Sequence, residues 1–195
     1  MAAPERLTEL DVVNSCLEEI HEAPIQTLVD QTSVLVAVAQ RVYNEVTRSV
    51  LLKGWNFNTD REVTLSPDGS NNILQGVDFL KADPCDVSLP YVWRGGKLWD
   101  YEENTDVFTD TVDFNIVRSL DFADIPPYAQ EYIKARTVRI FYGRSVGKGT
   151  NDYKVLTYDE SEALAEMRRG DVQSSDKTLL RNSRGGASRV MNRRI

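Results

Sequence analysis

The sequence is poor in the residues that most often hold metals or form disulfide frameworks. Its 195 residues include one histidine, His21, and two cysteines, Cys16 and Cys85. Zinc sites draw their ligands chiefly from cysteine and histidine, and disulfide scaffolds need several cysteines in a short chain. We therefore expect no metal centre, no disulfide framework and no histidine-rich catalytic site, and we expect no cofactor.

Long hydrophobic runs are also absent. No segment approaches the roughly 18 consecutive apolar residues of a membrane span. The first residues, MAAPERLTEL, lack the basic and apolar stretches of a secretory signal. The sequence therefore predicts a soluble protein that is made in the cytoplasm without a signal peptide and does not insert into membranes.

Basic residues are in the minority and are unevenly placed. The chain has 23 Lys and Arg against 30 Asp and Glu, a net charge of -7, which disfavours a general binder of polyanions. From Lys177 to Ile195 there are six basic residues and no acidic one, so residues 1–176 carry -13 and the end carries +6. Few large apolar side chains occur in this basic end, and we expect it to be flexible.

Four segments have the apolar periodicity and end signals of helices. Thr8 and Asp11 form a capping box before the first segment, Gly54 follows the second and Gly170 ends the fourth. The second is rich in valine, which lowers helix propensity, so this helix must depend on packing against neighbours. The four predicted helices are residues 8–21, 32–53, 127–142 and 152–169.

The middle of the chain, about residues 55–120, predicts a small antiparallel lobe. Residues 62–65 and 112–117 have strand character. The clearest signal is residues 91–99, where two aromatic arms flank Gly95 and Gly96, because glycines can supply the positive φ of a two-residue hairpin turn.

These elements together predict an α+β fold. It consists of a bundle of about four helices with an inserted small antiparallel β lobe and a flexible basic C-terminal tail. The expected parts are residues 1–54 and 123–170 for the bundle, 55–122 for the insertion and 171–195 for the tail.

Two apparent motifs have better structural explanations. Residues 143–150 are glycine-rich and include Lys148, but their spacing differs from a phosphate loop and they follow a helix rather than a strand. We expect a linker between helices there. Glu18 and His21 have the spacing of a di-iron ligand pair, but such a site needs a second histidine. We expect His21 to lie at a helix C-terminus, where a partial positive charge is favourable.

The acidic segment that begins at Asp100 allows two chemical hypotheses. Oxygen-bearing residues alternate as in a calcium loop, but Thr105 replaces the turn glycine and Thr111 the bidentate glutamate, so a solvated loop is expected. Its carboxylates could instead form the acid and base pair of a glycoside hydrolase, with Trp93 and Trp99 stacking a sugar. Strand tryptophans are more often core or interface residues. The carboxylates concerned are Glu102, Glu103 and Asp106, with Asp110 and Asp113 nearby.

Several segments, in the same order and at similar spacing, resemble one protein family. They extend over about residues 10–165, and the basic end beyond Gly170 has no shared pattern. The chain is similar to the tail tubular protein A family, the adaptor or gatekeeper proteins of short-tailed T7-like bacteriophages. The segments that carry the resemblance are residues 53–58, 64–68, 91–96 with Asp100, 114–118 with Asp121, 125–126 and 135–136.

This resemblance implies a structural virion protein of the phage tail, made in the host cytoplasm, rather than an enzyme. It implies a homo-oligomeric ring of about twelve copies that joins the portal protein to the tail nozzle protein, tail tubular protein B, with tail fibres attached nearby. Genomic DNA would pass through this ring during ejection without specific binding. A body of charge -13 suits such a channel because an acidic wall does not hold phosphates.

The resemblance also suggests which residues make contacts. We expect the second and third helices to contact neighbouring copies and residues 171–195 to extend to the portal, although a basic end can equally be a solubilising tail. The expected portal-binding residues are Lys177, Arg181, Arg184, Arg189, Arg193 and Arg194. The expected nozzle or neighbour contacts are Trp93, Arg94, Gly95, Gly96 and Trp99.

Two other functions remain open from the sequence. The first is a tail-associated hydrolase acting on host cell-surface polysaccharide, with Glu102, Glu103 and Asp106 as its catalytic residues. The second is a small DNA-binding regulator, which the net charge and the lack of a basic recognition helix disfavour.

Overall fold

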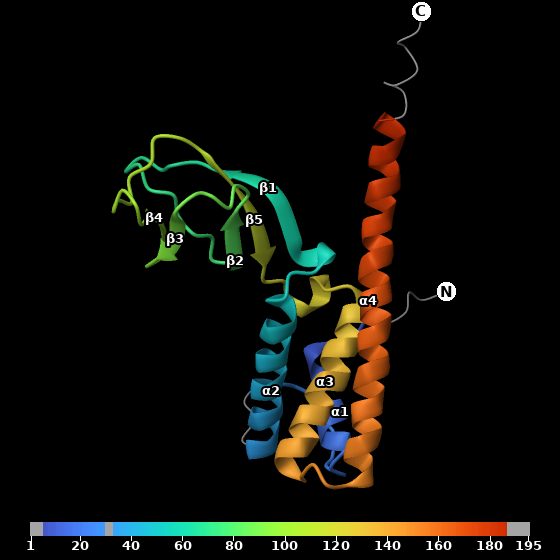
Figure 1. Cartoon of the computed structure of the whole chain (residues 1–195). Coiled ribbons are helices and arrows are strands. Elements are labelled where there is room, and N and C mark those ends of the chain that lie inside the picture. The colour runs from blue at the N-terminus through green and yellow to red at the C-terminus, as the bar shows by residue number, and fades with distance from the viewer. Residues whose placement is uncertain (1–5, 30–32, 187–195) are drawn as a thin grey trace, which may run out of the picture. The chain divides into compact units, whose positions relative to one another are not determined.

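The chain forms two compact units. The computed structural model describes residues 6–29 and 33–186, with side chains up to Ser174. The helical unit combines Met1–Val50 with Asp121–Ile195, and the β unit is Leu51–Leu120 (Figure 1). Helices in one unit and antiparallel sheets in the other confirm the predicted α+β class.

The described part of the helical unit contains four long helices, and each begins within two residues of its predicted start. Thr8 caps the first helix as predicted: its Oγ1 accepts a hydrogen bond from the Asp11 backbone N–H at 3.2 Å, and the Asp11 carboxylate accepts one from the Thr8 backbone N–H at 2.8 Å. The four helices are α1 (Glu9–Glu18), α2 (Val34–Leu51), α3 (Pro127–Ser145) and α4 (Asn151–Gly186).

The chain leaves α1 through a left-handed residue. The backbone N–H of His21 donates to the Glu18 carbonyl at 2.9 Å, and that of Glu22 donates to the Leu17 carbonyl at 3.0 Å. These two hydrogen bonds form the Schellman motif, in which a residue just beyond the helix end has a positive φ. That residue is His21, with a φ of 61°. The prediction that His21 lies at the end of this helix is confirmed.

Packing against neighbours holds the valine-rich α2, as its low propensity requires. Val42, Val46 and Val50 are buried along one side of the helix. Tyr43 lies edge-on to the ring of Phe122 with centroids 5.5 Å apart, and its hydroxyl donates to the Glu9 carboxylate at 3.2 Å. The apolar stripe predicted from the sequence is thus the side of α2 that enters the core.

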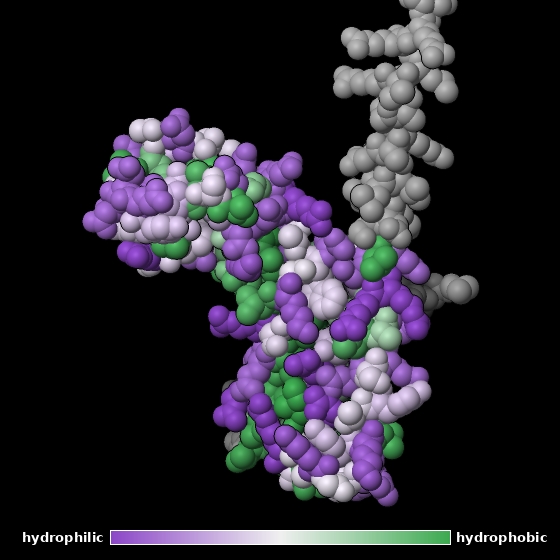
Figure 2. All heavy atoms as spheres, in the orientation of Figure 1, coloured by the Kyte–Doolittle hydropathy of each residue, from purple (hydrophilic) through white to green (hydrophobic). Residues whose placement is uncertain are grey.

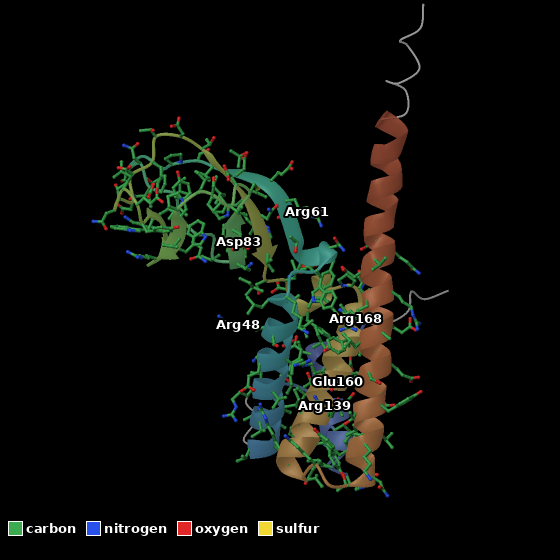
Figure 3. The ribbon with its side chains drawn as sticks, in the orientation of Figure 1. Arg48, Arg61, Asp83, Arg139, Glu160 and Arg168 are labelled. Atoms are coloured by element: carbon green, nitrogen blue, oxygen red, sulfur yellow. The ribbon has the colours of Figure 1, made fainter. Side chains whose placement is uncertain are left out.

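Charged and aromatic side chains join α3 to α4. The carboxylate of Glu160 pairs with the guanidinium groups of Arg139 and Arg136, and Arg139 also donates to the Tyr153 hydroxyl at 2.7 Å. Figure 3 shows Arg139 and Glu160 together between the two helices. Because these side chains are at least 73% buried, the ion pairs form part of the interior of the helical unit.

The predicted end of the fourth helix at Gly170 is wrong, because α4 continues to Gly186. Gly170 lies against the Tyr128 ring of α3, and an added Cβ would come within 2.6 Å of that ring. Gly143 of α3 lies in the same way against Tyr153 of α4, at 2.8 Å. Each helix thus supplies one glycine and one tyrosine, and close packing rather than helix termination explains both glycines.

The β unit contains two antiparallel sheets. One has the strand order β1-β5-β2 and the other is the β3-β4 hairpin. The strands predicted near 62–65 and 112–117 and the hairpin are present, whereas β2 was not predicted. β2 is an edge strand that ends in Pro84 and buries only Ala82, so its sequence lacks a clear alternation. The strands are β1 (Thr59–Leu65), β2 (Phe79–Pro84), β3 (Tyr91–Arg94), β4 (Lys97–Asp100) and β5 (Val112–Arg118).

One buried asparagine holds the two ends of the β unit together. The side-chain amide of Asn58 donates to the carbonyls of Leu51 and Arg118, each at 2.9 Å. Its Oδ1 accepts from the Trp55 backbone N–H at 2.8 Å. The segments that lead into and out of the inserted unit are therefore fixed beside each other.

Candidate functional site: interaction surfaces and an acidic pocket

The hairpin tip has the geometry that its sequence predicts. Gly95 and Gly96 have φ values of 57° and 80°, as a type I′ turn requires, and both are exposed. Arg94 is exposed beside them and pairs across the hairpin with Lys97. The tip therefore offers a cationic surface with open space around its two glycines.

The structure separates the two hairpin tryptophans. Trp93 packs against Phe114 with ring centroids 5.4 Å apart, and its indole N–H donates to the Ala82 carbonyl at 2.9 Å. Trp99 pairs with Val92 on the opposite face, where the Arg94 guanidinium lies 5.3 Å from its ring centroid. Of the five contact residues expected here, Arg94, Gly95 and Gly96 are exposed, whereas both tryptophans are half-buried. Trp93 packs against the core of the β unit, and Trp99 lies on the other face with its indole nitrogen buried.

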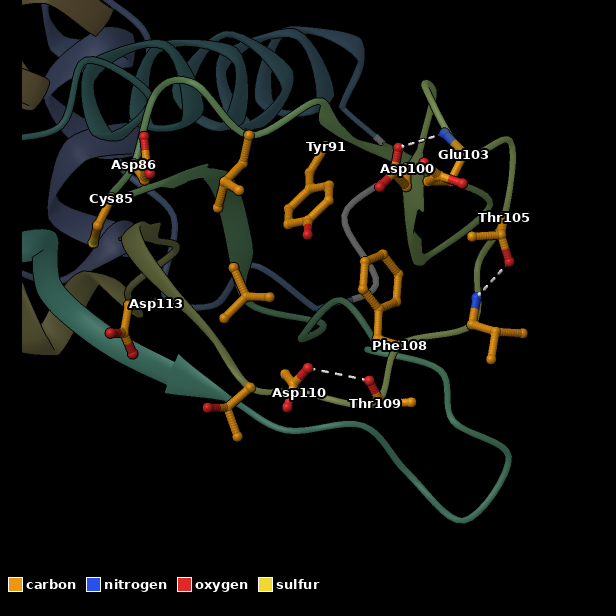
Figure 4. Close-up of a pocket in the computed structure, with 14 residues that line it drawn as sticks. Cys85, Asp86, Tyr91, Asp100, Glu103, Thr105, Phe108, Thr109, Asp110 and Asp113 are labelled. Atoms are coloured by element: carbon orange, nitrogen blue, oxygen red, sulfur yellow. Dashed lines mark hydrogen bonds between the residues drawn. The ribbon is translucent and has the colours of Figure 1, made fainter.

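A pocket of about 480 Å³ lies in the β unit (Figure 4). Its apolar lining includes Tyr91 and Phe108, whose rings lie edge-on at 5.3 Å, together with Leu89, Val107 and Val112. The pKa of Tyr91 is raised, first by burial and then by the negative charges of Asp100 and Asp110. The carboxylates that line the pocket are Asp86, Asp100, Glu103, Asp110 and Asp113.

The three candidate hydrolase carboxylates do not meet in this pocket. Glu103 lines it, whereas Glu102 and Asp106 do not. Asp106 instead lies 3.5 Å from the Lys97 ammonium, and Glu102 is exposed. Asp100 accepts hydrogen bonds from the backbone N–H groups of Glu102 and Glu103 at 2.9 and 3.0 Å, so it shapes the turn. This arrangement gives no support to an acid and base pair made from these residues.

The other motifs have the positions expected of structural segments. Residues 146–150 connect α3 to α4, so the predicted linker is present but is shorter than residues 143–150, because residues 143–145 belong to α3. The acidic loop turns at Asn104, with a φ of 55°, and returns to pair Thr105 with Asp100. Among the residues that the structure describes, no histidine, cysteine or carboxylate side chains gather in a group of three or more that could hold a metal ion.

The expected portal-binding residues divide into two sets. Lys177, Arg181 and Arg184 fall within α4, so the helix includes part of the segment expected to be a flexible tail. Their side chains lie beyond Ser174, the last that the structure describes, and Arg189, Arg193 and Arg194 lie outside the described residues altogether.

Two charged helix faces carry residues that were not named as contacts from the sequence, although the second helix was expected to contact neighbouring copies. Arg41 and Arg48 are exposed on α2, and Asp159, Glu162 and Glu166 are exposed on α4. The available signal was their helical spacing opposite the buried residues, which by itself indicates only a solvated face.

On the face seen in Figure 2, hydrophilic side chains cover most of the β unit and the hydrophobic patches are small and separate. None of the helices in the described ranges has the length and apolar character needed to cross a membrane.

Comparison with known proteins gives two matches that extend through both units. The model of the family described as tail tubular protein matches residues 10–177. Tail tubular protein A of Klebsiella phage KP34 is 27% identical over 177 residues, which cover 88% of this chain and 93% of that protein. The resemblance inferred from the sequence is confirmed. Since the family match includes the helical bundle and the inserted β unit, the chain belongs to the tail tubular protein family and is a structural component of a bacteriophage tail.

Proposed function

We propose that this protein is the head-to-tail adaptor of its virion. Copies of the chain form a ring, a dodecamer in the virion, that joins the portal protein to the nozzle protein and forms part of the DNA ejection channel. The observation that carries this proposal is the family match over residues 10–177, because it covers the helical unit and the β unit together. The role is structural, and the protein transforms no substrate.

The two units suit two kinds of contact. The helical unit has long helices whose buried ion pairs and aromatic contacts give it a rigid interior. The β unit presents Arg94, Gly95, Gly96 and Trp99 at the hairpin tip, which we assign to the nozzle protein or a neighbouring copy. Aromatic and arginine side chains are common anchors of protein interfaces.

Charge supports the passage of DNA. The β unit has 6 basic and 12 acidic residues, a net charge of -6, and residues 1–176 carry -13. DNA binds tightly where lysines and arginines neutralise many phosphates, and an acidic wall avoids such contacts. The genome therefore moves through the ring without specific binding.

The basic C-terminal segment is assigned to the portal. The spacing of positions 177, 181 and 184 in the continuous helix α4 places them on one side of that helix. α3 begins at Pro127, and its Tyr128 lies at the level of Gly170, so α4 extends past the start of α3. A basic helix that extends from the bundle suits an acidic partner surface.

Electron microscopy of the protein mixed with its portal tests this function. Negative-stain images and native mass spectrometry should show a ring on the portal, and the nozzle protein should bind only after that ring has formed. A protein that stays monomeric beside the portal would refute the adaptor role.

Two variants test the assigned contacts. Truncation after Ser174 keeps the described packing of α4 and should leave a folded protein with weaker portal binding. Arg94→Glu with Trp99→Ala should weaken nozzle binding while portal binding is kept. Unchanged binding in either variant would remove the assignment of that segment.

A further inference from the structure

The outer side of α2 carries two exposed arginines. Arg41 and Arg48 are seven residues apart, which is two helical turns or about 10 Å along the axis. The Arg41 side chain is 69% exposed and lies 3.6 Å from the Glu45 carboxylate one turn further along α2. Figure 3 shows Arg48 directed away from the bundle. The exposed side chains of Ala37 and Asn44 lie between and beside them on the same helix.

The outer side of α4 carries the opposite charge with the same spacing. Asp159 and Glu166 are exposed and also seven residues apart, and Glu162 lies between them. Glu166 also pairs with the exposed Arg169 one turn further along the helix. Val155 is 58% exposed next to this row. Each side also carries a residue of the opposite sign, Glu45 on α2 and Arg169 on α4. Arg41 and Arg48 nevertheless match Asp159 and Glu166 in charge and in separation.

Negative charge gathers further at this side of the helical unit. The pKa of Glu19, the C-cap residue of α1, is raised, first by partial burial and then by Glu18, Asp152 and Asp159. Carboxylates of α1 and α4 thus repel one another there. Basic side chains from another molecule would relieve this repulsion.

The two charged sides face different directions within the helical unit. α3 contacts both α2, through Arg144 and Glu45 at 2.8 Å, and α4, through Arg139 and Glu160. In Figure 1, α2 and α4 lie on opposite sides of α3 and run in the same direction. A closed ring of identical subunits needs such a pair of different, complementary surfaces on each subunit.

We infer that the basic side of α2 in one copy docks on the acidic side of α4 in the next copy. This inference rests on the proposed ring and names the surfaces that build it. A rotation about an axis parallel to the helices keeps α2 and α4 parallel, so Arg41 meets Asp159 while Arg48 meets Glu166. The same register places Ala37 beside Val155 and Asn44 beside Glu162.

The inferred interface differs in one helix from the sequence-based expectation, which named the second and third helices. α3 has few exposed side chains in the described structure, since its residues Ala129, Gln130, Tyr132, Ile133, Thr137, Val138, Phe141 and Tyr142 are buried. Up to Ser174, α4 has more exposed positions than α3.

Charge reversal on the full-length protein tests the pairing. We expect Arg41→Glu with Arg48→Glu to lower ring assembly on the portal at least tenfold, measured by native mass spectrometry, and Asp159→Lys with Glu166→Lys to do the same. Because the reversed charges are complementary, the fourfold variant should assemble again. Lys53→Glu with Arg61→Glu changes the net charge equally at exposed positions of the β unit and should assemble normally.

The outcomes separate this inference from the adaptor function. If the wild type forms rings and both double variants do so equally well, the α2–α4 interface is wrong and the ring is built elsewhere. If both double variants fail and the fourfold variant does not recover, the direct pairing is also wrong. If the wild type forms no ring with the portal, the proposed function itself fails. Circular dichroism of each variant confirms that the helices remain folded.

Discussion

Gly170 of α4 lies directly against the aromatic ring of Tyr128 in α3. A Cβ at Gly170 would come 2.6 Å from Cδ1 and 2.7 Å from Cγ of that ring, distances too short for any real contact. Cγ is near the root of the side chain, so the ring cannot move aside by a small rotation at its tip. This close approach explains how a glycine can lie inside a helix that continues to Gly186.

Gly170→Ala should therefore destabilise the protein, although alanine is the better helix former by about 1 kcal/mol. We expect a loss of about 1 to 3 kcal/mol in the free energy of unfolding, because overpacking forces backbone or ring displacement. Urea denaturation followed by circular dichroism measures it.

The control for this prediction removes the ring. In a Tyr128→Ala background the three ring atoms nearest to the added Cβ are absent, and Gly170→Ala should then stabilise the helix. A substitution that is stabilising in both backgrounds would show that the Gly170–Tyr128 contact does not limit this position.

Glu160→Gln should lower the free energy of unfolding by about 2 to 3 kcal/mol, because it leaves two largely buried arginines without their counter-charge. The Glu160 side chain is 12% exposed and pairs with Arg136 and Arg139. Glu166→Gln is the matched control on the same helix, since its pair with Arg169 is more than 60% exposed and contributes at most about 0.5 kcal/mol. If Glu160→Gln and Glu166→Gln lower the thermal unfolding temperature equally, the buried ion pair does not stabilise the protein more than the exposed one.

Glu19→Gln should raise the thermal stability at pH 7. The pKa of Glu19 lies above its ordinary value of 4.5 in the folded protein, by burial and by neighbouring carboxylates. The folded state therefore binds this proton more tightly, and the wild type loses stability as the pH rises through the raised pKa. The amide removes that loss, so the two proteins should converge below about pH 4, where the carboxyl is protonated.

The control for Glu19→Gln is Glu22→Gln, since Glu22 is exposed and is not among the carboxylates that raise this pKa. Melting curves from pH 3 to pH 8 compare the two variants. If Glu19→Gln does not raise the melting temperature at pH 7, the Glu19 carboxylate is not destabilised by its neighbouring carboxylates in α1 and α4.

The two cysteines should differ sharply in reactivity. Burial, and secondarily Glu19, raises the pKa of the Cys16 thiol to about 12, and Cys16 is fully buried, whereas Cys85 is exposed. Since the thiolate is the reactive form, iodoacetamide at pH 8 should modify one thiol in the native protein and two in denaturant. Peptide mass spectrometry should locate the native adduct at Cys85, and rapid labelling of Cys16 would contradict the packing of α1.

Local signals in the sequence predicted much of the fold. The capping box at Thr8, the valine stripe of α2 and the Gly95–Gly96 turn each act within a few residues, and each has its expected structure. The linker between α3 and α4 was recognisable because it follows a helix. The resemblance to the tail tubular family depended on the order of several such segments.

Features that depend on distant residues were not predictable in the same way. Whether Gly170 ends a helix depends on Tyr128, which is 42 residues away, and the sequence contains no local sign of their contact. The two tryptophans of the hairpin alternate to opposite faces, but the face that meets Phe114 is decided by the rest of the β unit. The carboxylates near Asp100 are close in sequence, yet turn geometry sends Glu103 and Asp106 to different surroundings.

Asn58 gives the inserted unit a modular character. The Asn58 side chain links the first and last backbone segments of residues 51–120 by hydrogen bonds. The spacing of the two junctions therefore does not depend on the length of the sheets between them. The junctions of the inserted unit are thus held by a residue of that unit itself, independently of the side chains in its sheets.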